Sequence, residues 1–208
     1  MRIRWYFDFI SPFAFLQWPK VRALAERHPV EFRPLLFAGL LEHNGQKGPA
    51  EIPAKRRFTY RHVTWLAQQQ GMSLRFPPAH PFNPLYALRL CVAAGNSPEA
   101  IGAIFNWFWV EGRAGDSIDA LAPLIRRFGI DDHALLADDA VKAALRSNFD
   151  EAVAEGVFGV PTLSLDGQLF WGNDAHAFAL AAIADQNLLS SQEMRALDDL
   201  PIGAARRT

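Results

Sequence analysis

The chain has 208 residues, half of them hydrophobic, and a formal net charge of -1 at pH 7. This length is enough for one sizeable core, or for a compact domain with an insertion. The balanced charge gives no basic excess for nucleic acid and no acidic excess typical of a disordered chain, so we expect a small molecule or another protein as partner.

The first fifty residues predict a strand, a helix and a second strand. Residues 3–9 are rich in aromatics, as strands often are. Ser11-Pro12 is a favoured N-cap followed by a favoured first helical residue. Residues 30–34 predict the second strand, which gives a βαβ unit with a parallel strand pair. Residues 37–53 contain three Gly and two Pro, and we expect a loop there.

The pattern over residues 54–155 predicts helices almost throughout. A glycine follows several of the expected helices, as is typical of helix C-termini. The aromatic residues near 105–109 would make one helix apolar nearly all round, which favours a buried helix. The expected helices span 54–70, 84–94, 98–111, 117–128 and 132–155, the last broken near Asp138-Asp139.

Strand character returns after this helical block. Residues 160–165 and 168–171 predict two strands joined by a tight hairpin turn at Asp166-Gly167. Asn173 or Asp174 is expected to cap a last helix over residues 175–186. A polar tail follows.

The layout predicts an α/β fold in which the βαβ and ββα parts share one sheet and the helical block is an insertion. The expected division is residues 1–53 and 156–188 for the two parts of the sheet domain, 54–155 for the helical insertion and 189–208 for the tail.

Ser11-Pro12 is the first candidate site. A helix N-terminus has unpaired N–H groups and a partial positive charge, so it favours an anion. Ser11 has no histidine near it in sequence and no G-x-S-x-G motif to make it a nucleophile. Its hydroxyl could instead donate a hydrogen bond to the thiolate of another molecule, although the motif alone favours a simple cap.

Two motifs near the end of the domain are candidate binding sites. A cis Val160–Pro161 bond would leave the Val160 backbone open to a peptide-like ligand, whereas a trans proline at a strand start is commoner. Asn173 and Asp174 at a helix start could hold the carboxylate and ammonium of an amino acid, or merely cap the helix.

The basic triplet Lys55-Arg56-Arg57 begins a predicted helix, where positive charge is unfavourable. This placement hints at an anionic ligand, although charge runs also occur on solvated faces. The six histidines lack metal-ligand spacing and Cys91 is the single cysteine, so we expect no metal site and no intrachain disulfide.

The sequence also bears on the compartment. A lone cysteine gives no reason for an oxidising compartment, and we expect Cys91 to be a small buried residue. The N-terminus lacks a signal-peptide pattern, and the longest apolar segment, residues 178–184, is far shorter than the roughly 18 residues that span a bilayer. We expect a cytoplasmic chain with no membrane partner.

Taken together, five segments in order resemble the 2-hydroxychromene-2-carboxylate isomerases and the kappa-class glutathione transferases, which are relatives of the DsbA-type thiol oxidoreductases. The resemblance runs from about Ile3 to Gln186. The segments are Phe7-Asp8-Phe9-Ile10-Ser11-Pro12-Phe13-Ala14-Phe15-Leu16, Pro53-Ala54-Lys55-Arg56, Pro81-Phe82-Asn83-Pro84-Leu85-Tyr86-Ala87-Leu88-Arg89, Gly156-Val157-Phe158-Gly159-Val160-Pro161-Thr162 and Phe170-Trp171-Gly172-Asn173-Asp174.

The resemblance implies a thioredoxin-like domain with an all-helical insertion, a homodimer, and glutathione as the ligand. It implies that Ser11 hydrogen-bonds the glutathione sulfur and that Val160, before a cis Pro161, pairs with the cysteinyl backbone. Asn173 and Asp174 would hold the γ-glutamyl end. Lys55 would lie near glutathione or an acidic substrate, and Asn83 near the substrate.

The activity that the resemblance implies is isomerisation of 2-hydroxychromene-2-carboxylate to trans-o-hydroxybenzylidenepyruvate, with glutathione as a cofactor. Reversible addition of its thiolate would convert a double bond to a single bond that can rotate. The four residues from Ser11 to Ala14 contain no cysteine where redox relatives have C-x-x-C, so the nucleophile must come from outside the chain. The alternatives are a kappa-like transferase that conjugates glutathione to an electrophile, and a non-catalytic protein that binds a thiol ligand.

The sequence also departs from the family. Ala175 stands where relatives often have Arg, and His62 where they often have Asp. Glu111-Gly112-Arg113 continues as Ala114-Gly115-Asp116 instead of the usual Asp-Ile-Ser/Asp. These departures leave the natural substrate open.

Overall fold

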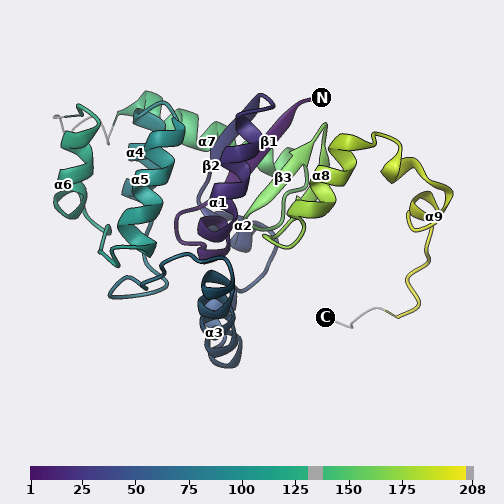
Figure 1. Ribbon diagram of the computed structural model, residues 1–208, viewed down its shortest axis with the longest axis horizontal. Helices are drawn as coiled ribbons and strands as arrows, with labels where there is room; N and C mark the ends of the chain where they lie inside the picture. The colour runs from purple at the N-terminus through teal and green to yellow at the C-terminus, as the bar shows by residue number, and fades with distance from the viewer. Residues whose placement is uncertain (131–137, 205–208) are drawn as a thin grey trace.

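A four-stranded mixed sheet forms the centre of the molecule (Figure 1). The computed structural model describes residues 1–130 and 138–204. β1 (Ile3–Phe7) runs parallel to β2 (Val30–Pro34) and antiparallel to β3 (Thr162–Leu165), which in turn runs antiparallel to β4 (Gln168–Trp171). The order β2-β1-β3-β4 confirms that strands from both ends of the sequence share one sheet.

Helices fill most of the chain between β2 and β3. The helices are α1 (Pro12–Ala25), α2 (Phe37–His43), α3 (Pro53–Gln69), α4 (Leu85–Ala93), α5 (Pro98–Trp109), α6 (Ile118–Arg127), α7 (Asp139–Ala154), α8 (His176–Ala184) and α9 (Gln192–Arg195), with short 3-10 turns at Pro49–Glu51 and Leu188–Ser190. The chain therefore has an α/β fold with a large helical insertion.

The two faces of the sheet carry separate apolar clusters because successive side chains in a strand point to opposite faces. Ile3, Trp5 and Phe7 of β1 belong to the larger cluster, which includes the buried aromatic residues of α5. Tyr6 belongs to a smaller cluster with residues of α2 and α7, among them Leu40. The prediction that α5 is a buried aromatic helix is confirmed.

Local signals at the helix ends act as predicted. Ser11 caps α1: its Oγ accepts a hydrogen bond from the Ala14 N–H at 3.2 Å. Ser97 caps α5 in the same way, with the Ala100 N–H as donor. α7 begins at Asp139 with Asp138 as its cap, and the expected helical residues before Asp138 lie outside the described part of the chain.

The expected loop over residues 37–53 is wrong, because this segment holds α2 and a 3-10 turn. The Asp8 Oδ2 accepts a hydrogen bond from the Phe37 N–H at the first residue of α2. Leu40 is fully buried in the smaller cluster beside Tyr6. Contacts from distant parts of the chain therefore stabilise a helix whose glycine, Gly39, disfavours it.

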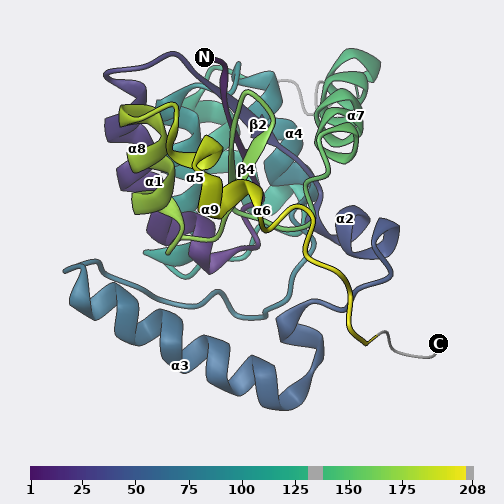
Figure 2. The same ribbon diagram turned by 90° about the vertical axis from the view of Figure 1, so that its right-hand side faces the viewer.

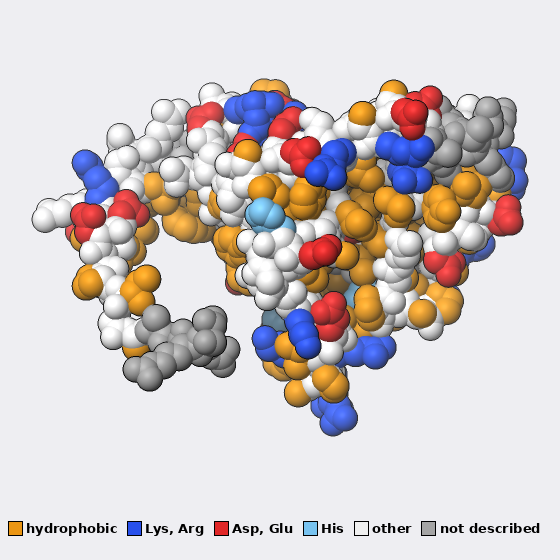
Figure 3. Space-filling view, turned by 180° about the vertical axis from the view of Figure 1, so that it is seen from behind, with side chains coloured by type: hydrophobic (Ala, Val, Ile, Leu, Met, Phe, Trp, Pro, Cys, Tyr) orange, Lys and Arg blue, Asp and Glu red, His pale blue; other side chains and the backbone are white. Residues whose placement is uncertain are grey.

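α3 projects from the rest of the molecule. Figure 2 shows α3 along the bottom, with the segment between α3 and α4 lying between it and the remaining helices. Only Val63 and Ala67 of α3 are buried. The helix carries four basic residues and no acidic ones, and blue side chains gather on this projection in Figure 3. α3 therefore offers a basic surface next to the sheet domain.

The C-terminal segment also extends away from the sheet (Figure 1). After α9, the side chains of Leu197, Leu200 and Ile202 are exposed. No helix among the described residues is long and apolar enough to cross a membrane.

Candidate functional site

Three predicted sequence motifs meet at one edge of the sheet. β1 ends at Phe7, four residues before Ser11, and its antiparallel partner β3 begins just after Pro161, with Tyr6 opposite Thr162. Thr162 also pairs with Trp171, the last residue of β4. The Gly172 N–H donates to the Pro161 carbonyl at 2.8 Å. The pairing therefore brings Ser11, the Val160–Pro161 bond and the Asn173-Asp174 segment to the same end of the sheet.

Ser11 lies at the N-terminus of α1, with only 7% of its surface exposed. Its backbone N–H donates to the Asp8 carbonyl at 3.1 Å, and its Oγ accepts from the Ala14 N–H. A hydroxyl that accepts one bond still has its own proton to donate. Ser11 can therefore donate a hydrogen bond to an anion at the positive end of α1.

The Val160–Pro161 peptide bond is cis, as predicted. Val160 is buried, and within residues 1–130 and 138–204 no group hydrogen-bonds to its backbone N–H or C=O. Buried backbone groups are normally paired. A peptide-like ligand could pair with these two groups by a strand-like contact.

The expected capping role of Asn173 and Asp174 is wrong. α8 begins two residues later, at His176, with Ala175 as a cap that makes no side-chain hydrogen bond. The buried Asn173 Oδ1 instead accepts a hydrogen bond from the Lys20 Nζ at 3.0 Å, across the sheet edge from α1. This long-range contact uses the amide oxygen that a cap would need.

Lys20 and Gln17 of α1 are site residues that sequence reasoning missed. Gln17 is fully buried; its Nε2 donates to the Gly172 carbonyl at 3.0 Å, and its Oε1 accepts from the Trp5 indole at 2.7 Å. Burial lowers the pKa of Lys20, whereas the charge of Asp174 raises it. The signal in the sequence is two polar residues spaced i, i+3 on a mostly apolar helix, which places them on one face.

His176 adds a buried imidazole beside this cluster. It is 7% exposed, and its Nδ1 has no hydrogen-bond partner among the described residues. Burial lowers the pKa of His176, and the charge of Lys20 lowers it further. The neutral imidazole is the form that fits next to a lysine.

Lys55 and Asn83 have no direct contact with Ser11 among the described interactions. Lys55 is exposed on the first turn of α3, and α3 reaches α1 through a contact between the Phe13 and His62 rings, 6.2 Å apart. Asn83 is exposed, and its Oδ1 accepts from the Leu85 N–H at 3.1 Å. No described interaction joins Lys55 or Asn83 directly to Ser11.

Asp8 holds the turn that precedes Ser11. Its carboxylate is fully buried and accepts hydrogen bonds from the Ile10 N–H at 3.1 Å and the Phe37 N–H at 2.8 Å. Burial raises the pKa of Asp8 to about 7, although these N–H groups lower it. Sequence reasoning used Asp8 only as part of a motif and missed this structural role.

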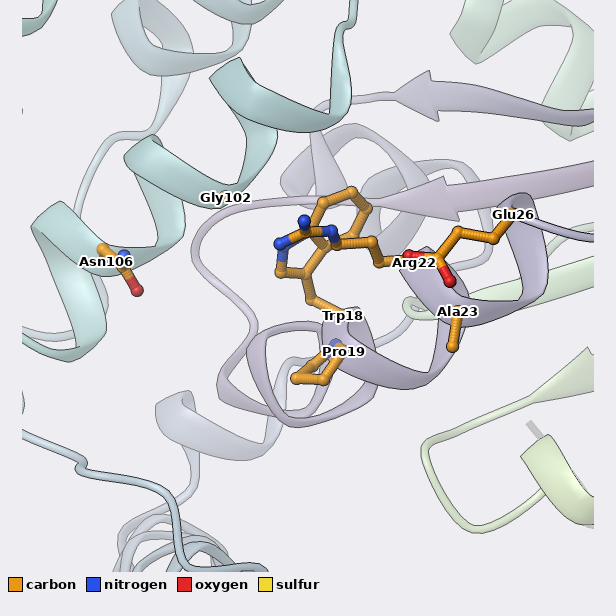
Figure 4. A pocket seen from close by; sticks show the side chains of 7 residues that line it. All are labelled: Trp18, Pro19, Arg22, Ala23, Glu26, Gly102 and Asn106. Carbon is orange, nitrogen blue, oxygen red and sulfur yellow. The ribbon is translucent and has the colours of Figure 1, made fainter.

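A separate cavity of about 380 Å³ lies between α1 and α5 (Figure 4). None of the candidate site residues lines it. The lining residues are Trp18, Pro19, Arg22, Ala23, Glu26, Gly102 and Asn106. In the part of the chain that the structure describes, no cluster of His, Cys, Asp or Glu could hold a metal ion.

Known proteins resemble this chain over most of its length. A 2-hydroxychromene-2-carboxylate isomerase from Pseudomonas putida is 28% identical over 183 residues, which cover 84% of this chain and 90% of that protein. Glutathione s-transferase kappa 2 from Caenorhabditis elegans is 25% identical over 195 residues, which cover 83% and 87%. A solved structure of a 2-hydroxychromene-2-carboxylate isomerase matches with a TM-score of 0.74 and 25% identity, covering 92% of this chain and 100% of that one.

A family model provides the assignment. The model of the DSBA-like thioredoxin domain matches residues 2–184, which include all four strands and the Ser11, Val160–Pro161 and Asn173-Asp174 segments. The chain therefore belongs to the DSBA-like thioredoxin domain family.

Proposed function

We propose that this protein is a glutathione-dependent isomerase that interconverts 2-hydroxychromene-2-carboxylate and trans-o-hydroxybenzylidenepyruvate. The observation that carries the proposal is the meeting of three parts at one sheet edge: Ser11 at a helix N-terminus, the unpaired backbone of Val160, and the Lys20–Asn173 cluster. The homodimer that the resemblance implies and the expected cytoplasmic location belong to the same proposal.

The polar groups at this edge match the chemistry of glutathione. The Val160 N–H and C=O suit the cysteinyl backbone, because an extended peptide pairs with free backbone groups. Lys20 and Asp174 carry opposite charges, which suit the carboxylate and the ammonium of the γ-glutamyl end. Asn173 lies beside Lys20 and accepts a hydrogen bond from it.

Ser11 has the role of lowering the pKa of the bound thiol. Glutathione, when bound, supplies a thiolate that adds reversibly to a conjugated carbon of the substrate, so that the former double bond can rotate. The Ser11 hydroxyl donates to the sulfur, and the positive end of α1 favours its negative charge. Cys91 takes no part, because it is fully buried and burial raises the pKa of its thiol.

A row of aromatic side chains supports an aromatic substrate. Phe13, two residues after Ser11, contacts His62 of α3, and His62 contacts Phe58 and Trp65 with ring distances of 5.4 and 6.2 Å. Phe58 and Trp65 are 67% and 54% exposed. In this proposal Lys55, on the same helix, attracts the substrate carboxylate, and Asn83 lies near the substrate.

A kappa-like transferase is the second candidate, favoured by the 25% identity to glutathione s-transferase kappa 2. The two activities use the same thiolate. They differ in its fate, because an isomerase releases glutathione unchanged whereas a transferase releases a thioether.

The test is conversion of 2-hydroxychromene-2-carboxylate, followed by ultraviolet absorbance, with glutathione, without it, and with S-methylglutathione. We expect conversion only in the condition that contains glutathione, and no net consumption of the glutathione thiol. S-Methylglutathione is the matched control, because it fills the same site and has no thiol. Formation of a thioether would favour the transferase. No conversion in any condition would overturn the isomerase.

A further inference from the structure

The backbone around Ser11 is held by groups from the helical insertion. The Trp109 indole of α5 donates to the Phe9 carbonyl at 2.8 Å. The His80 Nε2, in the segment between α3 and α4, lies 2.8 Å from the Ile10 carbonyl oxygen. Ile10 directly precedes Ser11. The insertion therefore fixes both carbonyls that lead into the candidate thiolate site.

The hydrogen bonds determine the tautomer of His80. A carbonyl oxygen only accepts, so the Nε2 must carry the proton that it donates to Ile10. In a neutral imidazole the Nδ1 then accepts, and the Tyr60 hydroxyl lies 2.7 Å from it. The Tyr60 hydroxyl also lies 2.8 Å from the His80 carbonyl oxygen, so its single proton has two acceptors within reach on His80, the carbonyl and Nδ1. The Arg56 Nε donates to the same hydroxyl at 3.0 Å.

The surroundings of His80 favour this neutral form. The imidazole is half-buried between aromatic rings, with Phe76 at 6.1 Å and Trp109 at 5.4 Å. Burial lowers the pKa of His80; the bond to Ile10 raises it, and the nearby Arg56 charge lowers it. The Arg56 Nη2 also donates to the His80 carbonyl at 2.9 Å, so α3 holds both the ring and the backbone of this residue.

We infer that His80 is a positioning residue: it fixes the Ile10 carbonyl, and hence Ser11, and couples the Ser11 turn to α3 through Tyr60 and Arg56. α3 buries little else against the sheet domain, so this chain of hydrogen bonds is a main polar link between the two. α3 also carries Lys55 and the aromatic row, so the link would hold the substrate surface in place relative to the thiolate. The inference rests on the proposed function.

The experiment compares His80→Leu, His80→Gln and Tyr60→Phe in the full chain. Leucine removes the donor to Ile10, whereas the glutamine Nε2 can replace it. The measurements are kcat, KM, the dissociation constant of glutathione, and the thiol pKa of bound glutathione from thiolate absorbance near 240 nm. His43→Leu, at an exposed histidine at the end of α2, is the matched control.

We expect His80→Leu to lower kcat about tenfold and to raise the thiol pKa of bound glutathione, because displacement of a group by a fraction of an ångström is costly in an active site. The dissociation constant should change by less than about threefold, since the Val160 and Lys20 contacts remain. His80→Gln should recover most of the lost kcat. The kcat of Tyr60→Phe should fall between those of His80→Leu and His80→Gln. A merely structural role would lower the stability of each variant and leave the thiol pKa unchanged, which would overturn the inference.

The imidazole nitrogen spectrum of His80 tests the arrangement without any ligand. A protonated Nε2 and an accepting Nδ1 support it, and the opposite tautomer overturns it. Absence of glutathione binding to the unmodified chain would overturn the proposed function and, with it, the effect of His80 on the thiol. A fully active His80→Leu variant would overturn the inference alone.

Discussion

Ser11 combines two roles in one side chain. Its Oγ accepts the Ala14 N–H and so caps α1, and its proton remains available at the same helix end. In redox relatives a cysteine stands at this junction, where the helix N-terminus lowers the thiol pKa. With serine here, the same electric field can act only on a thiol that arrives with a ligand.

Ser11→Ala separates the two roles. We expect kcat to fall by about 10- to 100-fold, because one donor to the developing charge is lost, while the dissociation constant of glutathione changes much less. Loss of the cap should also cost about 1 kcal/mol of stability. Steady-state kinetics and urea unfolding measure the two effects.

Ser97→Ala is the matched control for Ser11→Ala. Ser97 precedes Pro98 and caps α5 through the Ala100 N–H, with the same local geometry. The Ser97→Ala variant should lose a similar free energy of unfolding and keep the kcat of the unmodified chain. Equal kinetic losses in both variants would show that Ser11 acts only as a cap.

Lys20→Met tests the residue that sequence reasoning missed. Methionine keeps most of the length of the side chain and removes the charge that lies 3.0 Å from Asn173. We expect about tenfold weaker binding of glutathione by calorimetry, because a charge-assisted hydrogen bond to a carboxylate is lost. Lys142→Met, at a lysine paired with Asp139 on α7, is the control and should bind as the unmodified chain does. An unchanged affinity of Lys20→Met for glutathione would show that Lys20 does not bind the ligand.

At the scale of elements, Asp8 joins β1 to α2. Its two carboxylate oxygens serve the Ile10 N–H before α1 and the Phe37 N–H at the start of α2. Helix α2 was predicted as a loop because its own residues give weak signals, and its stability comes from Asp8 and from burial of Leu40. The Ser-Pro caps, in contrast, were predictable because their partners lie within three residues in the sequence.

Asp8 makes stability depend on pH in a definite direction. Its pKa is about 7 in the folded chain, against an ordinary value of 3.8. Between these values the folded chain binds more protons than the unfolded chain, so the Asp8 contribution to stability falls as pH rises from about 4 to 7. The slope can reach about 1.4 kcal/mol per pH unit.

Asp8→Asn removes this slope. We expect the variant to be less stable at low pH, since the amide cannot accept both N–H groups, and the gap to the unmodified chain to narrow as pH approaches 7. Urea unfolding at several pH values from 5 to 8 measures this difference in the free energy of unfolding. Parallel curves for the two proteins would show that Asp8 does not titrate in this window.

At the scale of the whole molecule, the site is built by strand pairing across the full sequence. β1 and β3 are separated by the entire helical block, yet Tyr6 lies opposite Thr162. The motif order and the resemblance were enough to predict the sheet and the cis Val160–Pro161 bond. The contacts of Lys20 with Asn173, and of His80 with Ile10, join residues far apart in sequence, so no local pattern could predict them.

A crystal structure with glutathione tests the central claim most directly. The account predicts the sulfur within hydrogen-bond distance of the Ser11 Oγ, the cysteinyl backbone paired with Val160, and the γ-glutamyl end beside Lys20, Asn173 and Asp174. Glutathione bound elsewhere, for example in the cavity between α1 and α5, or with its sulfur turned away from Ser11, would contradict it.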